Sequence, residues 1–387
     1  MPRRSDIPIK SGETLHKKFW NNDTEAVIGI VLVLLVLGSI NVFSSSFILA
    51  EADYGTPYFF LKKHAIFAVV GLIIFCGIAF FMDYHKIRSW MPFILGFTIL
   101  ALLAVLVIGP AVNGAKRWLP LGPIQMQPAE IAKLVSIMIT SAYLAQCVNR
   151  NENATLFNPQ MALIVPLFVL TELEPDMGTA CIILGVPLFM MLVVGLKKEH
   201  IQMLAGLILV GVPLMVILQP YRLQRVMVTW DPWSDAQNIG YQTVQSLSAI
   251  GSGELWGMGL GVGVSKYDYL PEAHTDFAFA IFCQENGFVG ALFVFLLYAA
   301  LIVYGARIAN KAVDAYGQVL AMGILLLITG QAIANLLMVS GTFPVVGVPL
   351  PFISYGGTSL LVSLTAMAIL VNIGKISDEY RRKHRGE

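Results

Sequence analysis

Residues 26–47, AVIGIVLVLLVLGSINVFSSSF, decide the fold class of this chain. The run carries no charge, and as a helix it would be about 33 Å long, enough to cross the hydrocarbon core of a bilayer. The whole chain has the same character, because 57% of its 387 residues are hydrophobic and only 13% are charged. Soluble domains typically have about 25% charged residues. We therefore infer a polytopic membrane protein and exclude a secreted disulfide scaffold, a disordered protein and a nucleic-acid binder.

Further apolar runs predict an all-α transmembrane bundle of about ten spans, forming one domain over residues 1–387. The spans must be helices, because backbone polar groups in lipid need partners within the same segment. The four cysteines fall inside these runs without disulfide or metal spacing, so we expect them to be packing residues. The predicted spans are 26–47, 64–82, 91–109, 129–148, 160–173, 178–195, 201–218, 278–304, 315–340 and 356–374.

The distribution of Lys and Arg predicts the orientation of the bundle. With the N-terminus in the cytoplasm, 17 of the 25 basic residues lie in inside segments and seven lie outside, while Lys133 falls within a span. This excess predicts that both termini are cytoplasmic. The tails would comprise residues 1–25 and 375–387, and the first tail with its span reads as an uncleaved signal anchor.

Residues 219–276, between the seventh and eighth predicted spans, are expected to form a large extracellular loop. They hold six carboxylates against three cations, together with seven Trp and Tyr residues. A functional loop and a solvated loop with an aromatic belt both fit this composition. Glycines alternate over residues 257–263 and indicate either a phosphate-binding turn or a flexible, closely packed backbone. A dinucleotide site is excluded, because it needs a βαβ unit.

Two titratable residues, His274 and Asp276, directly precede the eighth predicted span. Asp276 could cap the following helix or form a structural ion pair. Alternatively it is a general base whose pKa is raised by an apolar rim. His274 would then either orient Asp276 or have a structural role.

Four cations on the predicted outer face run against the positive-inside tendency. Lys116 and Arg117 are adjacent, and Arg222 and Arg225 are three residues apart. Such residues can bind an anionic ligand such as a pyrophosphate, since Arg presents a planar fork to phosphate. Snorkelling to lipid headgroups is the alternative explanation.

Ionisable residues also occur within the fourth predicted span, where Glu130 and Lys133 face the same way at i, i+3. A mutual structural pair would satisfy both; the alternative for Lys133 is that it faces a polar cavity. Residues 341–357 contain three prolines and cannot form a regular helix, so we expect them to be buried or to line a cavity. The start of the last span, near Ser354, Gly356 and Gly357, is either an anion-binding helix N-terminus or an ordinary cap.

Together these motifs resemble the SEDS family (shape, elongation, division and sporulation), which includes FtsW, RodA and SpoVE. The resemblance covers essentially the whole chain, and the motifs occur in family order. Residues 220–222, 231–233 and 253–257 look closest to FtsW, the septal member. The matching motifs are NGAKRW at 113–118, QPAEIAK at 127–133, PDMGT at 175–179, GYQ at 240–242, LPEAHTDF at 270–277 and PFISYGG at 351–357.

The resemblance implies an inverting peptidoglycan glycosyltransferase that polymerises lipid II at the outer face of the cytoplasmic membrane. Its implied role is septal cell division; a lateral-wall polymerase and a lipid II flippase are the alternatives. The family's essential aspartate matches Asp276. We expect substrate-binding residues at Lys116, Arg117, Trp118, Lys133, Arg222, Arg225, Glu272 and His274. Supporting residues are expected at Glu130, Asp176, Ser354, Gly356 and Gly357.

The resemblance also implies partners. These are lipid II and the nascent glycan strand, a class B penicillin-binding protein that acts as transpeptidase, divisome proteins and membrane lipids, with no nucleic acid. No cofactor is certain, but family activity is supported by a divalent cation, Mg²⁺ or Mn²⁺.

The chain departs from the family pattern at two places. Residues 283–287 read Cys-Gln-Glu-Asn-Gly, whereas the family usually has Gly-Glu-Glu-Leu-Gly, so Gln284 is an amide in place of a carboxylate. Glu174 replaces the usual Gln before the PDMGT motif and adds a negative charge near the predicted outer face.

Overall fold

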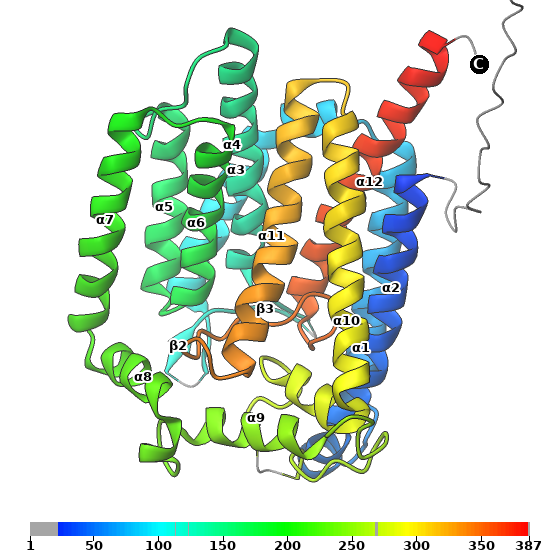
Figure 1. Cartoon of the computed structure of the whole chain (residues 1–387), viewed down its shortest axis with the longest axis vertical. Helices are drawn as coiled ribbons and strands as arrows, with labels where there is room; N and C mark the ends of the chain where they lie inside the picture. The colour runs from blue at the N-terminus through cyan, green and yellow to red at the C-terminus, as the bar shows by residue number, and fades with distance from the viewer. Residues whose placement is uncertain (1–21, 113, 123, 268–269, 386–387) are drawn as a thin grey trace, which may run out of the picture.

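The computed structural model describes residues 22–112, 114–122, 124–267 and 270–385. Most of the predicted N-terminal tail (residues 1–21), Asn113 of the NGAKRW motif and residues 386–387 lie outside the described residues. The described chain folds into a bundle of helices with two small β-hairpins at one end (Figure 1). The all-α fold class is therefore confirmed.

The first half of the chain supplies six α-helices and both hairpins. A π-helical turn, η1 (Gly77–Phe81), continues α2, and the hairpins β1–β2 and β3–β4 are antiparallel and precede α4. The elements are α1 (Asp23–Tyr54), α2 (Phe59–Cys76), α3 (Tyr84–Ile108), β1 (Ala111–Val112), β2 (Ala115–Lys116), β3 (Leu119–Leu121), β4 (Ile124–Met126), α4 (Pro128–Arg150), α5 (Pro159–Leu173) and α6 (Met177–Val194).

The second half supplies the remaining helices and an irregular segment, residues 340–356, between α11 and α12. Its elements are α7 (Lys198–Ile217), α8 (Pro220–Trp230), the 3-10 turn η2 (Pro232–Asp235), α9 (Tyr241–Ser252), α10 (Ala278–Lys311), α11 (Ala315–Val339) and α12 (Gly357–Arg385).

All ten predicted span ranges fall on helices, namely α1 to α7 and α10 to α12. Among the described residues, eight helices are long and apolar enough to cross a membrane: α1, α2 with η1, α3, α4, α6, α10, α11 and α12. Helix α5 is apolar but has only 15 residues, and α7 is not among the eight. The total of ten spans therefore stays a prediction.

Two segments outside the predicted spans are helical in part. Residues 219–276 contain α8 and α9, and Pro220 occupies the first turn of α8, where its missing N–H costs nothing. The predicted tail from residue 375 continues α12 to Arg385. The Arg381 guanidinium donates to Lys311 O at 2.8 Å and ties this extension to the end of α10.

Helices α4, α11 and α12 form the centre of the bundle, since most of their apolar stretches are buried. Helices α2 and α3 lie at the periphery and expose large apolar side chains, as expected of surfaces that face lipid. Helix α7 forms one edge of the bundle, while α8 and α9 lie across the same end as the hairpins (Figure 1).

Helix α10 is broken at Gly287, whose backbone is non-helical (φ 64°, ψ −167°). A break in a buried helix leaves amide and carbonyl groups that need new partners. Residues 254–259, which follow α9, supply them through backbone hydrogen bonds of 2.9–3.1 Å. The amide of Met258 donates to Gln284 O, and the amide of Gly259 donates to Glu285 O. In the other direction, the amides of Phe288 and Val289 donate to Glu254 O and Leu255 O.

Close packing at this break explains one of the alternating glycines. Gly257 has φ 82°, and a Cβ built on it would lie 2.1 Å from Glu285 O. No other residue fits both the left-handed backbone and the contact. At Gly257 the structure therefore favours the closely packed backbone over the phosphate-binding turn.

This contact gives a stability prediction. We expect Gly257→Ala to destabilise the protein by about 1–3 kcal/mol through backbone strain alone, with the steric clash adding to it. The measurement is the apparent Tm of the detergent-solubilised protein. Gly251→Ala is the matched control, because a Cβ at Gly251 meets nothing within 4 Å. Equal Tm values for both variants would contradict the proposed packing.

Candidate active site

A cavity of about 1460 Å³ lies at the end of the bundle that carries α8 and α9. It is larger than the pockets of about 300–1,000 Å³ that hold drug-sized ligands. Its walls come from the hairpins, the α5–α6 turn, the last turns of α7, helix α8, the segment before α10 and residues 341–359. Segments far apart in the sequence therefore converge on one site.

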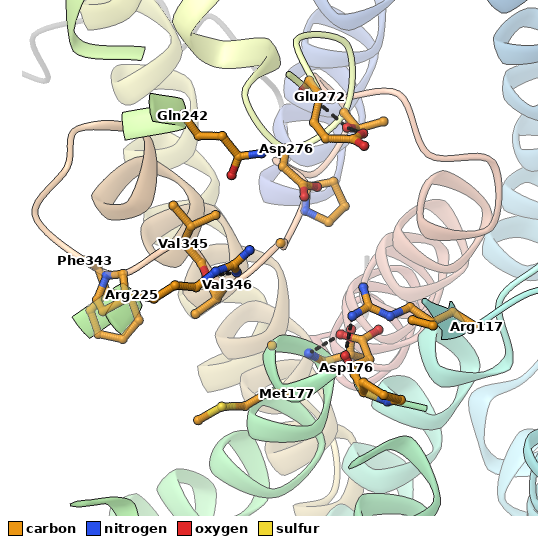
Figure 2. A pocket seen from close by; sticks show the side chains of 18 of the residues that line it. Arg117, Asp176, Met177, Arg225, Gln242, Glu272, Asp276, Phe343, Val345 and Val346 are labelled. Carbon is orange, nitrogen blue, oxygen red and sulfur yellow. Dashed lines mark hydrogen bonds between the residues drawn. The ribbon is translucent and has the colours of Figure 1, made fainter. Parts of the chain in front are cut away.

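Asp276 lies in this wall, two residues before α10 begins. The side-chain amide of Asn335 on α11 donates to Asp276 O at 2.8 Å and to Val348 O at 2.7 Å. One buried amide thus ties the backbone of Asp276 to both α11 and the segment between α11 and α12. Figure 2 shows the Asp276 side chain in the pocket, with Gln242 and Glu272 close to it.

The environment of Asp276 favours its protonated form. Burial is the largest cause and raises its pKa to about 7. The negative charges of Glu272 and Asp176 contribute in the same direction. Arg117 and Arg225 lower the pKa and limit the increase. A carboxyl with this pKa is partly ionised at neutral pH and can both accept and release a proton.

Three arginines line the same cavity, one from the hairpin region and two from α8. The Arg117 guanidinium donates to the carbonyls of Glu174 (3.4 Å) and Pro175 in the α5–α6 turn. Arg225 on α8 donates to Val345 O at 2.6 Å. Arg222, also on α8, forms an ion pair with Glu172. The structure therefore brings together cations that the sequence placed in separate segments.

Most of the other predicted site residues also lie in the cavity wall. Asp176 accepts from Gln127 Nε2 at 2.9 Å and from Thr179 N at 3.2 Å, so it caps α6 while it faces the cavity. Gly356 and Gly357 bring the first turn of α12 to the wall. The remaining members are Trp118, Glu130 and Glu272.

Three predicted substrate-binding residues do not line the cavity. Lys116 Nζ donates to Leu106 O, in the last turn of α3, at 3.2 Å. Lys133 is buried and donates to Glu130 (2.8 Å) and to Gln331 (2.9 Å). These contacts favour the structural pair with Glu130 over a position facing a polar cavity. The structure gives no support to a substrate-binding role for these two residues.

His274 is the third of these residues. Its ring packs 4.6 Å from the Phe60 ring and 5.7 Å from the Tyr355 ring, measured between centroids. Its carbonyl accepts from Tyr355 N at 2.9 Å, and burial lowers its pKa. These contacts fit a structural role. Ser354 is likewise buried away from the cavity, where its hydroxyl accepts from Leu350 N at 3.0 Å and shapes the segment before α12.

Several lining residues were not identified from the sequence as site residues. Gln242 on α9, Lys63 on α2 and Tyr355 before α12 all belong to the cavity wall. Gln242 and Tyr355 lie in the GYQ and PFISYGG motifs, which were the available signal. Lys63 is a further cation on the predicted outer face, and its position in the wall depends on the packing of α2.

The described side chains do not identify a metal site. No group of three or more His, Cys, Asp or Glu side chains in the described ranges is arranged to hold an ion. The dependence on a divalent cation therefore stays a prediction.

Comparison with known proteins places the chain in a family. A sequence model of the FtsW/RodA/SpoVE family, described as cell cycle protein, matches residues 25–379. The chain belongs to this family. Stage V sporulation protein E of Bacillus subtilis (strain 168) is 36% identical over 356 residues, covering 90% of this chain and 96% of that protein.

A second relative carries an enzyme name. It is called "Probable peptidoglycan glycosyltransferase FtsW", from Nitrosomonas europaea, and is 36% identical over 368 residues, covering 93% of this chain and 94% of that protein. Among solved structures, one titled "Structural coordination of polymerization and crosslinking by a peptidoglycan synthase complex" superposes with a TM-score of 0.72. It is 25% identical and covers 91% of this chain and 97% of the other.

One departure from the family pattern, Glu174, lies beside the cavity. Its side chain is fully buried, and neither carboxylate oxygen has a hydrogen-bond partner among the described residues. Burial raises its pKa to about 8, the charge of Asp176 adds to the increase, and Arg117 opposes it. The folded protein therefore favours the protonated form of Glu174 at pH values below about 8.

The buried acid predicts a pH-dependent stability. Unfolded Glu174 would ionise near its ordinary pKa of 4.5, whereas the folded form keeps its proton up to about pH 8. Stability therefore falls as pH rises between these values, by about 1.4 kcal/mol for each pH unit. Glu174→Gln removes this loss, so we expect its apparent Tm to exceed that of the unaltered protein by several degrees at pH 8.

The comparison is a thermal-shift series from pH 5 to pH 8. The gain in apparent Tm from Glu174→Gln should shrink toward pH 5. There, Glu174 is increasingly protonated in the unfolded protein as well as in the folded protein. Glu152→Gln changes an exposed carboxyl at the opposite end of the bundle and serves as the control. A pH-independent effect of Glu174→Gln would rule out the buried-acid explanation.

Proposed function

We propose that this protein is a peptidoglycan glycosyltransferase that polymerises lipid II into glycan strands. The observation that carries the proposal is that Asp276 and three arginines line the same cavity, where the pKa of Asp276 is about 7. A group that can accept a proton and a set of cations are the two requirements of a transfer in which a hydroxyl attacks and a pyrophosphate leaves. Family membership and the enzyme name of a relative support the same reaction class.

The reaction joins the 4-hydroxyl of one disaccharide to the anomeric carbon of another. As the new carbon–oxygen bond forms, the bond from the anomeric carbon to the lipid pyrophosphate breaks, and the hydroxyl proton passes to Asp276. A positioned general base typically contributes roughly 10²–10⁴ in rate. Conversion of an α-linked donor into a β-linkage is an inversion, so no covalent enzyme intermediate is needed.

The arginines would stabilise the charge on the pyrophosphate. Arg117, Arg222 and Arg225 are held by backbone carbonyls or by Glu172 and face the cavity from two sides. Preorganised cations of this kind stabilise a leaving anion without having to be rearranged during the reaction.

The lipid part of the substrate needs an apolar path to the cavity. Val212, Val216 and Ile217 on α7 line the cavity, and α7 lies at the edge of the bundle (Figure 1). We assign the lipid chain to this side, because a substrate anchored in the bilayer must reach the site without leaving it.

The proposal extends to location and partners. The cavity end would face outward at the cytoplasmic membrane with both termini inside, in accord with the distribution of Lys and Arg. We propose a class B penicillin-binding protein as partner and septal cell division as the role; the solved neighbour's title, which couples polymerisation with crosslinking, supports a transpeptidase partner. The expected Mg²⁺ or Mn²⁺ dependence would arise from a cation that accompanies the pyrophosphate.

The central test is Asp276→Asn. It keeps the side-chain volume but removes the base, so polymerisation should fall by a factor of at least about 10². The assay follows glycan length from labelled lipid II in detergent, with the partner present. Detergent has no two sides, so long products report polymerisation and a pure flippase would give none.

A matched control makes the same chemical change elsewhere. Asp53→Asn alters an exposed aspartate near the end of α1 and outside the cavity wall, and it should leave activity unchanged. Asp276→Asn should keep normal expression and size-exclusion behaviour. Full polymerase activity in a folded Asp276→Asn protein would refute the role of Asp276 as the base.

The pH profile supplies a second test. A base must be ionised to act, so the rate should rise with pH through a value near 7. Glu272→Gln removes a negative charge that raises the pKa of Asp276, so this limb of the profile should move to lower pH. A shift to higher pH, or none, would contradict the assignment of the limb to Asp276.

A further inference from the structure

A buried ion pair lies beside the break in α10, outside the cavity wall. Lys266 Nζ is 2.6 Å from Glu285 Oε1, and both side chains are 1% exposed or less. The Ser44 hydroxyl on α1 donates to the Glu285 carboxylate, 2.6 and 2.7 Å from its oxygens, and Gly261 N donates to it at 3.1 Å. One carboxylate thus joins α1, α10 and the segment after α9.

The neighbouring Gln284 fastens the same segment. Its Nε2 donates to Ser252 Oγ (2.8 Å) and to Ser265 Oγ (3.0 Å), and its Oε1 accepts from Ser265 N at 3.3 Å. The amide fits this position because it donates and accepts at once. Ser265 and Lys266 are therefore fixed on α10 side by side.

These contacts lie ten residues before Asp276 in the chain. Leu270 N donates to Ser265 O at 3.0 Å, and Phe277 N donates to Glu272 O at 3.2 Å, so Leu270 is tied to Ser265 and residues 272–277 form a tight turn. At its far end Asn335 holds Asp276 O. The segment that carries Asp276 is consequently held at two places, on α10 through Lys266 and on α11 through Asn335.

Stability alone does not account for such a pair. Removing two charges from water is costly, and well-packed apolar residues can often replace a buried pair without loss of stability. An ion pair, unlike an apolar contact, is directional. The Lys266 ammonium lies 2.6 Å from Glu285 Oε1 and 4.9 Å from the centre of the Phe47 ring, so its contacts define one position for the segment.

We propose that Lys266 and Glu285 are positioning residues, whose ion pair fixes the segment between α9 and α10 so that Asp276 is held at the cavity. They touch no residue of the proposed reaction and would act through the backbone between Lys266 and Asp276. The inference rests on the proposed role of Asp276.

The experiment compares three variants with the unaltered full chain. Lys266→Met breaks the pair. Lys266→Met/Glu285→Gln removes both charges and keeps acceptors for Ser44 and Gly261. Lys311→Met is the matched control, because it makes the same change in the ion pair with Asp23 at the opposite end of α10. Each is measured for kcat and KM with lipid II, for apparent Tm, and for amide hydrogen exchange of peptides within 262–277.

Lys266→Met should raise amide exchange in residues 270–277 at least tenfold and lower kcat at least tenfold, with KM changed less than twofold. The double variant should regain apparent Tm, since no unpaired charge remains, but should regain neither kcat nor slow exchange. Lys311→Met should match the unaltered protein in all three measurements.

Two results would overturn the proposal. One is unchanged kcat and exchange in Lys266→Met. The other is a double variant in which kcat and slow exchange return together with Tm, because the pair would then only balance charge. Exchange does not depend on catalysis, so an active Asp276→Asn protein would refute the proposed base and leave the anchoring of the segment separately measurable.

Discussion

The site depends on one buried amide, the side chain of Asn335. It is fully buried and donates to both Asp276 O and Val348 O, two carbonyls from segments that have no regular structure. One helical turn earlier, Gln331 Nε2 donates to Pro349 O at 2.9 Å, and its oxygen accepts from Lys133. Irregular backbone deep in a membrane protein is tolerated only where protein groups satisfy it. Two amides on one face of α11 therefore allow a loop and a proline-rich segment to meet at the cavity.

The same rule explains the break in α10. A continuous helix would satisfy its own backbone and leave no reason for residues 254–266 to fold back against it. Because Gly287 interrupts the helix, the freed groups pair with residues 254–259, and the side chains of Gln284 and Glu285 bind residues 261–266. The distortion is thus the means by which the segment before Asp276 is fixed to the bundle.

Sequence reasoning predicted the helices well and the direction of side chains poorly. The ten apolar ranges fall on helices because long uncharged runs in this chain have no other structure available to them. Asp276, Arg117, Arg222 and Arg225 were found because charges on an otherwise apolar chain are conspicuous. Lys266 was counted with the outer cations, yet it is buried. Charge and spacing could not distinguish Lys266 from the exposed cations. Its burial depends on a break in α10, and contacts between distant segments set that break.

The cations of the cavity influence the proton affinity of Asp276 through their charge. Arg117 and Arg225 donate to main-chain carbonyls, and their positive charges lower the pKa of Asp276. A pyrophosphate bound by these arginines would cancel part of their positive field, so the proton affinity of Asp276 would increase once substrate is present. Under the proposed function, the base is then strongest when an acceptor hydroxyl can use it.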